Sequence, residues 1–214
     1  MGLFDRFKKS EKPATENVSR GFHAIAIQEL KHLNSDSVQV SFQIPAELQK
    51  EFAFVPGQYI NLEVLVNEKK ERRSYSICSG PSEPLAVAVK RIDKGLVSNY
   101  LNDQKTTDFP IWISKPEGNF KLISSAKNIV CIAAGSGITP ILSMGKHLSS
   151  ATQMHLFYGS KQKDAILFEA ELASLSNVHC THYLSQEERD GFEYGRITKD
   201  RFTEKIKANL SLLQ

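Results

Sequence analysis

The chain has 214 residues, of which 41% are hydrophobic and 24% are charged. These fractions are close to those of ordinary globular proteins, so they argue against disordered, fibrous and membrane-spanning classes. The 27 basic and 24 acidic residues leave a formal net charge of +3. No stretch concentrates Lys and Arg as a nucleic-acid-binding surface requires. The length allows one large domain or two modest ones.

Cysteine usage and the start of the chain indicate the compartment. Cys78, Cys131 and Cys180 are widely spaced and odd in number, which is typical of reduced thiols and not of a disulfide framework. The sequence has neither the apolar run of a signal peptide nor the roughly 18 apolar residues that span a bilayer. We therefore expect a cytoplasmic protein without stable membrane insertion, which begins with a flexible tail over residues 1–18.

The first half of the chain is patterned as strands. Apolar residues recur at every second position in several stretches of residues 22–64, a period that predicts strands. Further strands are expected over residues 73–78, 85–92 and 109–114, and one short helix over residues 96–102. Many strands with little helix predict an antiparallel barrel or sandwich.

The pattern changes near residue 122. Strands are predicted over residues 128–134, 155–158 and 178–184, and helices over residues 137–149, 165–175 and 196–207. Alternation of strands and helices specifies a parallel sheet with helices on its faces. The sequence therefore predicts two domains, one over residues 19–122 and an α/β domain over residues 123–214.

A glycine turn joins the first α/β strand to its helix, in the stretch A-G-S-G-I-T-P that contains Gly135, Ser136, Gly137 and Thr139. Glycines let backbone N–H groups approach a phosphate, and a helix N-terminus favours its negative charge. The turn is neither a Walker A loop nor a complete G-x-G-x-x-G, because Pro140 replaces the last glycine. A tight connection without any ligand is the alternative interpretation.

The second α/β strand ends in Ser160 and Lys161. Dinucleotide folds that take NAD usually place an acidic side chain here, which receives the ribose 2′-hydroxyl. A hydroxyl and an ammonium suit a 2′-phosphate instead, so the residues favour NADPH slightly over NADH. The alternative is that Lys161 is a solvated loop residue, and Asp164 lies close by.

A strand in the first half carries R-R-S-Y-S-I-C-S, in which Arg73 and Tyr75 fall on one face and Ser74 and Ser76 on the other. An arginine and a tyrosine on one face can hold a phosphate and stack an aromatic ring together. An exposed face at a sheet edge is the alternative.

Taken in order, four motifs resemble the ferredoxin-NADP reductase superfamily. They are F-x-P-G-Q-Y at residues 54–59, R-x-Y-S-x-x-S at 73–79, G-x-x-S at 95–98 and G-S-G-I-T-P at 135–140. The resemblance covers about residues 20–205. The stretches Y-G-S-K, L-S-Q-E and G-R-I in the second half are most similar to reductases that serve phenylacetate-CoA oxygenase and related multicomponent oxygenases.

The resemblance implies an antiparallel Greek-key, FAD-binding β-barrel domain followed by a Rossmann-like NAD(P)-binding α/β domain. Arg73 would pair with the FAD diphosphate, Tyr75 would pack on the flavin, and Ser76 would lie near flavin N5, where hydride arrives. Further residues implied to border FAD are Val89, Lys90, Gly95, Leu96, Val97 and Ser98. Those implied to border the dinucleotide are Gly135, Ser136, Gly137, Thr139, Ser160 and Lys161.

The implied activity is hydride transfer from NAD(P)H, with NADPH slightly favoured, to FAD, followed by single-electron transfer to an iron–sulfur or oxygenase partner. No metal site is expected, because His179 and His182 point to opposite faces of a strand. The chain departs from related reductases in lacking a later C-G-P segment and the cysteine spacing of a [2Fe–2S] domain. We therefore expect a truncated chain, and a [2Fe–2S] cluster would require a further domain after Gln214. FMN in place of FAD stays open. The alternative function is a flavin-binding electron-transfer or sensing subunit without nicotinamide turnover.

Overall fold

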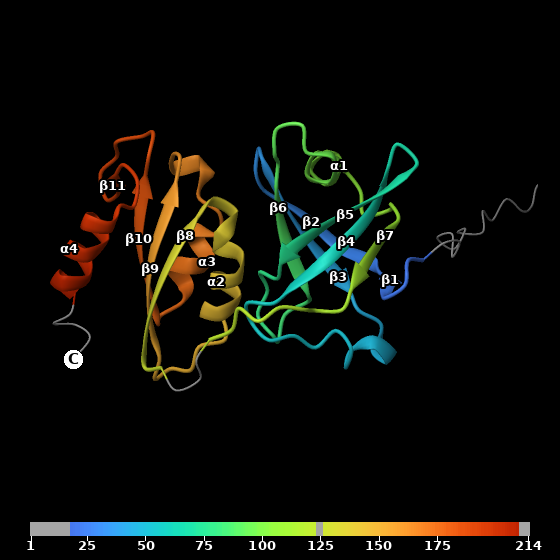
Figure 1. Ribbon diagram of the computed structural model, residues 1–214, viewed down its shortest axis with the longest axis horizontal. Coiled ribbons are helices and arrows are strands. Elements are labelled where there is room, and N and C mark those ends of the chain that lie inside the picture. Colours follow the sequence, from blue (N-terminus) through green and yellow to red (C-terminus); the bar gives the residue numbers. More distant parts are fainter. Residues whose placement is uncertain (1–17, 123–125, 210–214) are drawn as a thin grey trace, which may run out of the picture.

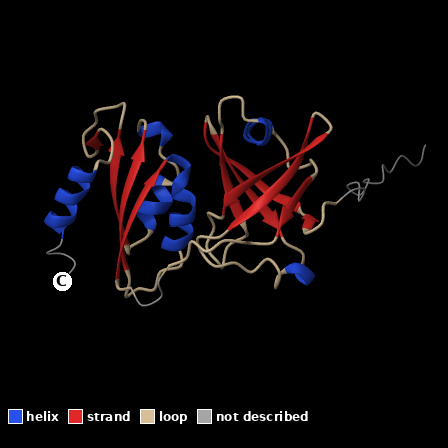
Figure 2. Cartoon of the chain, viewed as in Figure 1, coloured by secondary structure: helices blue, strands red, loops and turns tan. Residues whose placement is uncertain are grey.

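The structure is a computed structural model that describes residues 18–122 and 126–209. Two parts with different sheets lie side by side (Figure 1). Residues 22–114 form antiparallel sheets, and residues 128–194 form a parallel sheet with helices (Figure 2). The predicted order, an antiparallel β part followed by an α/β part, is confirmed. The domain limits at residues 19–122 and 123–214 stay a prediction, and residues 1–17 of the predicted tail lie outside the described residues.

The antiparallel part consists of two sheets with strand orders β1-β7-β4-β5 and β2-β3-β6. Its elements are β1 (Phe22–Ala24), β2 (Ala26–Asn34), β3 (Ser37–Gln43), β4 (Tyr59–Val66), β5 (Lys69–Ser76), β6 (Ala86–Lys90), α1 (Leu96–Asp103) and β7 (Ile111–Ser114). Alternate residues of β3 and β4 point inward, so side chains such as Val40, Phe42, Ile60 and Leu62 are fully or almost fully buried between the sheets. Helix α1 packs against β3–β6 near one end of these sheets (Figure 1).

The β4–β5 hairpin sets the position of the strand that carries the R-x-Y-S motif. Asn67 and Glu68 connect the two strands, and both have positive φ angles, 51° and 64°. Two such residues make the tight turn whose twist matches that of paired strands. The resulting register places Tyr75 opposite Ile60 and Arg73 opposite Leu62. Both motif side chains therefore lie on one face, as the period-two alternation predicts.

The α/β part has one sheet with the order β11-β10-β9-β8, whose pairs are all parallel. Its elements are β8 (Asn128–Ala134), α2 (Ile138–Gly145), β9 (Gln153–Ser160), α3 (Glu169–Ser174), β10 (Val178–Leu184), β11 (Glu193–Tyr194) and α4 (Lys199–Asn209), with short 3₁₀ turns at Gly135–Gly137 and Lys163–Ala165. Helices α2 and α3 cover the face turned toward the antiparallel part, and α4 lies on the other face (Figure 1).

Side-chain alternation along β9 explains why both faces need helices. Met154, Leu156 and Tyr158 are buried in the core under α2 and α3. Phe157 points to the other face, where its ring meets Phe202 of α4 edge to face at 5.1 Å. In the described residues, no helix is long and apolar enough to cross a membrane.

Candidate functional site

The R-x-Y-S residues lie at the end of β5 that is furthest from its hairpin turn. Tyr75 is half-buried against the antiparallel core, and this burial raises the pKa of its phenol to about 12 in spite of the neighbouring Arg73 charge. The phenol is therefore neutral at physiological pH. The Arg73 side chain is 53% exposed, with Nη1 donating to the Arg72 carbonyl and lying 3.6 Å from Glu71 Oε2. Strand β5 thus presents an aromatic ring, a guanidinium and the Ser76 hydroxyl.

The start of α1 is built around Gly95, which precedes its first residue. A Cβ at this position would lie 2.4 Å from Ser98 Oγ and 3.1 Å from the Ile92 carbonyl oxygen, so a larger residue would displace the Ser98 hydroxyl. Ser98 Oγ accepts the Ile92 N–H at 3.2 Å, which ties the turn to the helix. The first N–H groups of a helix lack acceptors within it, so Leu96, Val97 and Ser98 form an end that suits a phosphate.

Strand β6 connects this turn to the α/β part. Val89 is fully buried, and its carbonyl accepts the amide of Asn102 at 3.1 Å. Lys90, the next residue, extends toward the glycine turn, where its Nζ is 3.8 Å from the position of a Cβ on Gly135. Val89 is thus fixed by α1, and Lys90 projects across to the α/β part.

The glycine turn follows β8 directly and is braced by two hydroxyls. The fully buried Tyr158 donates to the Gly135 carbonyl at 3.0 Å and accepts the Leu167 N–H at 3.2 Å. Thr139 Oγ1 donates to the Ser136 carbonyl at 3.0 Å. A Cβ on Gly137 would meet no atom within 4 Å. Protein packing therefore does not demand a glycine at position 137, whereas a ligand that approaches the backbone would.

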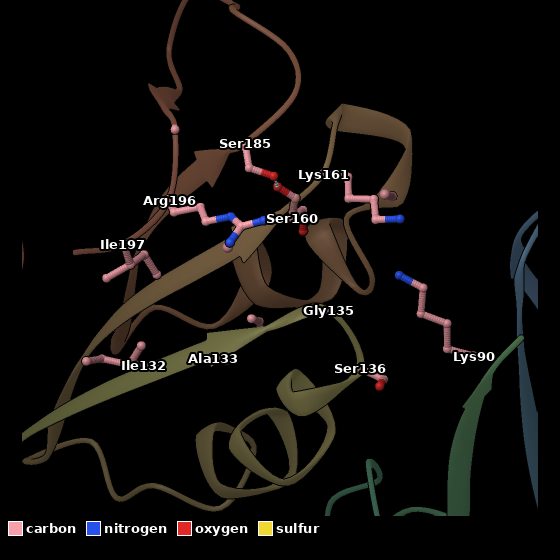
Figure 3. A pocket seen from close by; sticks show the side chains of 14 residues that line it. Lys90, Ile132, Ala133, Gly135, Ser136, Ser160, Lys161, Ser185, Arg196 and Ile197 are labelled. Atoms are coloured by element: carbon pink, nitrogen blue, oxygen red, sulfur yellow. Dashed lines mark hydrogen bonds between the residues drawn. The ribbon is translucent and has the colours of Figure 1, made fainter. Parts of the chain in front are cut away.

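A cavity of about 540 Å³ opens where β8, β9 and β10 end, next to this turn (Figure 3). The residues that line it are Lys90, Ile132, Ala133, Ala134, Gly135, Ser136, Gly159, Ser160, Lys161, Ala165, Ser185, Gly195, Arg196 and Ile197. They include three cations and no carboxylate. Within the described part of the chain, none of Lys90, Lys161 and Arg196 has a salt bridge. The cavity therefore suits an anionic ligand.

The three cations enter the cavity from different elements. Figure 3 shows Lys90 coming from β6 and Lys161 from the end of β9, with their amino groups pointing toward one another. Arg196 follows β11 and points toward Ser160. The Ser160 Oγ atom is buried and has no hydrogen-bond partner among the described residues. A phosphate-bearing ligand fits this environment, because it would give partners to the hydroxyl and to the cations.

Arg196 and Ser185 are site residues that the sequence reasoning did not identify. Ser185 Oγ donates to the Ser160 carbonyl at 3.3 Å. Gly195 has a φ of +98°, and its N–H donates to the Leu184 carbonyl at 2.7 Å, which turns Arg196 back over the strand ends. The G-R-I stretch could have indicated Arg196, because a glycine before a cationic residue allows a turn that directs the cationic side chain.

The predicted residues thus fall into two groups. Gly135, Ser136, Ser160, Lys161 and Lys90 line one cavity. Gly137 and Thr139 belong to its glycine turn but do not line it. The remaining predicted residues lie in the antiparallel part, on β5, β6 and the start of α1, and these are Arg73, Tyr75, Ser76, Val89, Gly95, Leu96, Val97 and Ser98. Lys90 belongs to β6 of the antiparallel part and also lines the cavity, so it connects the two groups.

Comparison with known proteins agrees with this division. Residues 24–122 match the model of the oxidoreductase FAD-binding domain, and residues 131–212 match that of the oxidoreductase NAD-binding domain. The chain belongs to the ferredoxin-NADP reductase family. The resemblance drawn from the four ordered motifs is therefore confirmed.

Curated relatives include reductase components of oxygenases. The chain is 31% identical over 166 residues to one of the subunits of 1,2-phenylacetyl-CoA epoxidase from Escherichia coli (strain K12), covering 74% of this chain and 46% of the relative. It is 32% identical over 154 residues to the ferredoxin reductase component of 3-ketosteroid-9-alpha-monooxygenase from Rhodococcus rhodochrous, covering 69% and 43%. The chain thus spans less than half the length of these relatives.

Solved structures show the same fold at lower identity. A ferredoxin NADP+ reductase from Neisseria gonorrhoeae with bound FAD and NADP has a TM-score of 0.70 and 20% identity, over 89% of this chain and 78% of that one. The FAD/NAD-binding domain of nitric oxide dioxygenase from Vibrio cholerae has a TM-score of 0.73 and 21% identity, over 88% and 92%.

Proposed function

We propose that the protein is a flavoprotein reductase that takes hydride from NAD(P)H onto FAD and passes single electrons to an iron–sulfur or oxygenase partner. The observation that carries the proposal is the cavity with three cations and no carboxylate, beside a strand that brings Lys90 from the FAD-binding domain. The two cofactors supply the hydride donor and acceptor when they are bound. The chain supplies binding, orientation and charge.

On the flavin side, the proposed roles follow from the side chains at hand. Tyr75 offers a rigid, half-buried ring for packing on the flavin, and its high pKa keeps the ring neutral. The exposed guanidinium of Arg73 and the first turn of α1 offer two sources of positive potential for the FAD diphosphate. Ser76 is the hydroxyl that we assign to the neighbourhood of flavin N5.

On the nucleotide side, the cations support two separate phosphate positions. Lys90 and the backbone of Gly135–Gly137 would hold the diphosphate that NADH and NADPH share. Ser160 and Lys161 lie where β9 ends, and Arg196 points toward Ser160 from the turn after β11, so the three would hold a phosphate on the adenosine ribose, with Lys161 on the side that faces Lys90. This second group is the basis for our preference for NADPH over NADH.

The partner is inferred from the relatives. The phenylacetyl-CoA epoxidase relative and the ketosteroid monooxygenase component belong, by their names, to multicomponent oxygenase systems. We propose an acceptor of the same class, with an iron–sulfur centre or in the oxygenase itself. The three unpaired thiols are consistent with a reducing, cytoplasmic setting.

The proposal is tested by loading the purified protein with FAD and following NADPH oxidation with two acceptors, a [2Fe–2S] ferredoxin and free riboflavin. Faster turnover with the ferredoxin is the expected result. Turnover only with riboflavin would restrict the function to reduction of small acceptors. Flavin binding without any nucleotide oxidation would favour the alternative electron-transfer or sensing subunit.

A further inference from the structure

The two parts of the chain share a packed boundary, formed by β6 and the segment before it on one side and by α2 and α3 on the other. Cys78, Ala86 and Ala88 of the antiparallel part are buried in the core of the α/β part. Ser143 of α2 donates from Oγ to the Ser79 carbonyl at 2.7 Å, and both residues are buried. The boundary is therefore closely packed and partly hydrogen-bonded.

A glycine of the F-x-P-G-Q-Y motif permits this close packing. A Cβ on Gly57 would lie 1.9 Å from the Phe120 carbonyl oxygen and 2.5 Å from Met144 Cε of α2. Gly57 also has a φ of +99°, which disfavours any other residue. The motif glycine thus serves the contact between the two parts.

Lys146, which directly follows α2, forms a salt bridge across the boundary. Its Nζ lies 2.8 Å from Glu83 Oε2 of the antiparallel part and 2.8 Å from Glu171 Oε2 of α3. Only 15% of its side chain is exposed. Burial alone would lower the pKa of Lys146, but the hydrogen bonds and charges of Glu171 and Glu83 outweigh it and raise the pKa. The ammonium is therefore charged when it meets both carboxylates.

The Glu83 side of the bridge is itself held in place. The same Oε2 atom accepts the Gly80 N–H at 2.9 Å, which closes the turn between β5 and β6. A Cβ on Gly80 would lie 3.2 Å from Lys146 Cβ, so the turn and the lysine are in close contact. The carboxylate therefore couples a rigid turn of the antiparallel part to the end of α2.

The geometry links this bridge to the cavity. Helix α2 begins just after the glycine turn and ends at Gly145, beside Lys146, about 12 Å away at 1.5 Å per residue. Strand β6 begins near Glu83 and ends at Lys90, which lies close to Gly135. The two elements thus run along the boundary in opposite directions, one on each side of it. Tilting α2 at its Lys146 end would move the glycine turn relative to Lys90 and β6.

We propose that the Lys146–Glu83 ion pair is a positioning contact that sets the orientation of the nucleotide-binding turn relative to the flavin-binding strand. This inference rests on the proposed function. Hydride transfer depends steeply on the placement of donor and acceptor, and a 1 Å error can cost about 100-fold in rate. Hydride transfer from the nucleotide to the flavin would therefore be faster in the protein with this ion pair than in a variant that lacks it.

The matched pair of variants is Glu83→Gln and Glu171→Gln. Each removes one carboxylate from Lys146, but only the first cuts the link between the two parts. In anaerobic rapid mixing of the FAD-loaded protein with NADPH, Glu83→Gln is expected to slow the limiting rate of flavin reduction about fivefold or more, with NADPH affinity within about twofold of wild type. Glu171→Gln is expected to keep the rate within about twofold. Adding Lys146→Met to Glu83→Gln should cost little more than Lys146→Met alone.

A second readout needs no cofactor. Spin labels on Lys50→Cys and Glu188→Cys, exposed positions in the two parts, report their separation. Burial raises the pKa values of the native thiols, to about 12 for Cys78, 11 for Cys131 and 12 for Cys180, so the introduced exposed thiols react faster at pH 7. Protein without the two introduced cysteines, labelled in the same way, gives the background. The distance distribution should broaden with Glu83→Gln and stay unchanged with Glu171→Gln.

Equal effects of the two glutamate variants, or no effect of Glu83→Gln on either the rate or the distances, would overturn the positioning role. If the wild-type flavin is reduced by neither NADPH nor NADH, the proposed function fails, whereas the distance measurement still decides whether the ion pair fixes the orientation.

Discussion

Replacing Arg196 with alanine is expected to separate the two nicotinamide nucleotides. The guanidinium points toward Ser160, where β9 ends, and is one of three cations in a cavity without a carboxylate. If it binds the phosphate on the adenosine ribose, Arg196→Ala removes one charge-assisted hydrogen-bonding group. Such a loss costs about 1.5–3 kcal/mol, which corresponds to a roughly 10- to 150-fold weaker Kd for NADPH. NADH lacks this phosphate, so its Kd should change less than about twofold.

The matched control is Lys90→Ala, at the other phosphate position. Lys90 lies beside the glycine turn, and the diphosphate proposed to bind there is common to both nucleotides. This variant should therefore weaken NADPH and NADH by similar factors. Relative Kd values are measured by equilibrium titration of the FAD-loaded protein and of each variant with NADP+ and NAD+, which carry the same phosphates as NADPH and NADH but do not reduce the flavin. Equal weakening of NADH and NADPH by Arg196→Ala, or no weakening of either, would refute the assignment of Arg196 to the ribose phosphate.

Three further predictions concern flavin binding, packing and acid stability. Arg73→Ala should weaken FAD binding by about 1.5–3 kcal/mol, whereas Arg72→Ala on the opposite strand face should leave it nearly unchanged; flavin fluorescence titration measures both, and equal losses would contradict the role of Arg73. Gly57→Ala should lower the unfolding free energy by about 2–5 kcal/mol. The control Gly191→Ala, also at positive φ but with open space around it, should lower it by about 1 kcal/mol. Similar losses for both variants in denaturant melts would exclude the close contacts around Gly57 as the cause. Burial alone would raise the pKa of Glu63, but hydrogen bonds from two cations and a serine outweigh it and hold the pKa below its ordinary 4.5. The ionised carboxylate therefore stabilises the fold above pH 4.5, and this contribution is lost as the pH falls through the lower folded-state pKa. Glu63→Gln should remove this acid-dependent loss of unfolding free energy, and a variant with the same pH profile as the wild type would rule out Glu63 as its cause.

The sequence predicted the α/β strands best. The limits of β8 and β10 coincide with the predicted residues 128–134 and 178–184, because both stretches are rich in the β-branched and aromatic residues that favour strands. Helix α3 begins at Glu169 and not at residue 165. The reason is that Lys163–Ala165 form a 3₁₀ turn and Phe168 adopts a left-handed φ of 60° before the helix begins.

Other features depend on contacts that no local pattern records. Strand β11 has only two residues, too few for a period to show. The α4 helix begins at Lys199, three residues after its predicted start, because the Gly195 turn first carries Arg196 over the cavity. Ser160 and Lys161 were therefore predicted as site residues from the sequence, whereas Arg196 was not. Similarly, the motif around Gly57 was recognised, but its contact with α2 depends on how the two parts pack.

The most direct test of the central claim is anaerobic mixing of the FAD-loaded protein with increasing concentrations of NADPH or of NADH, followed through the visible absorbance of the flavin. We expect the absorbance of the oxidised flavin to disappear with both nucleotides, and to do so at a lower concentration of NADPH than of NADH. A flavin that binds stably yet stays oxidised with both nucleotides would contradict the central claim.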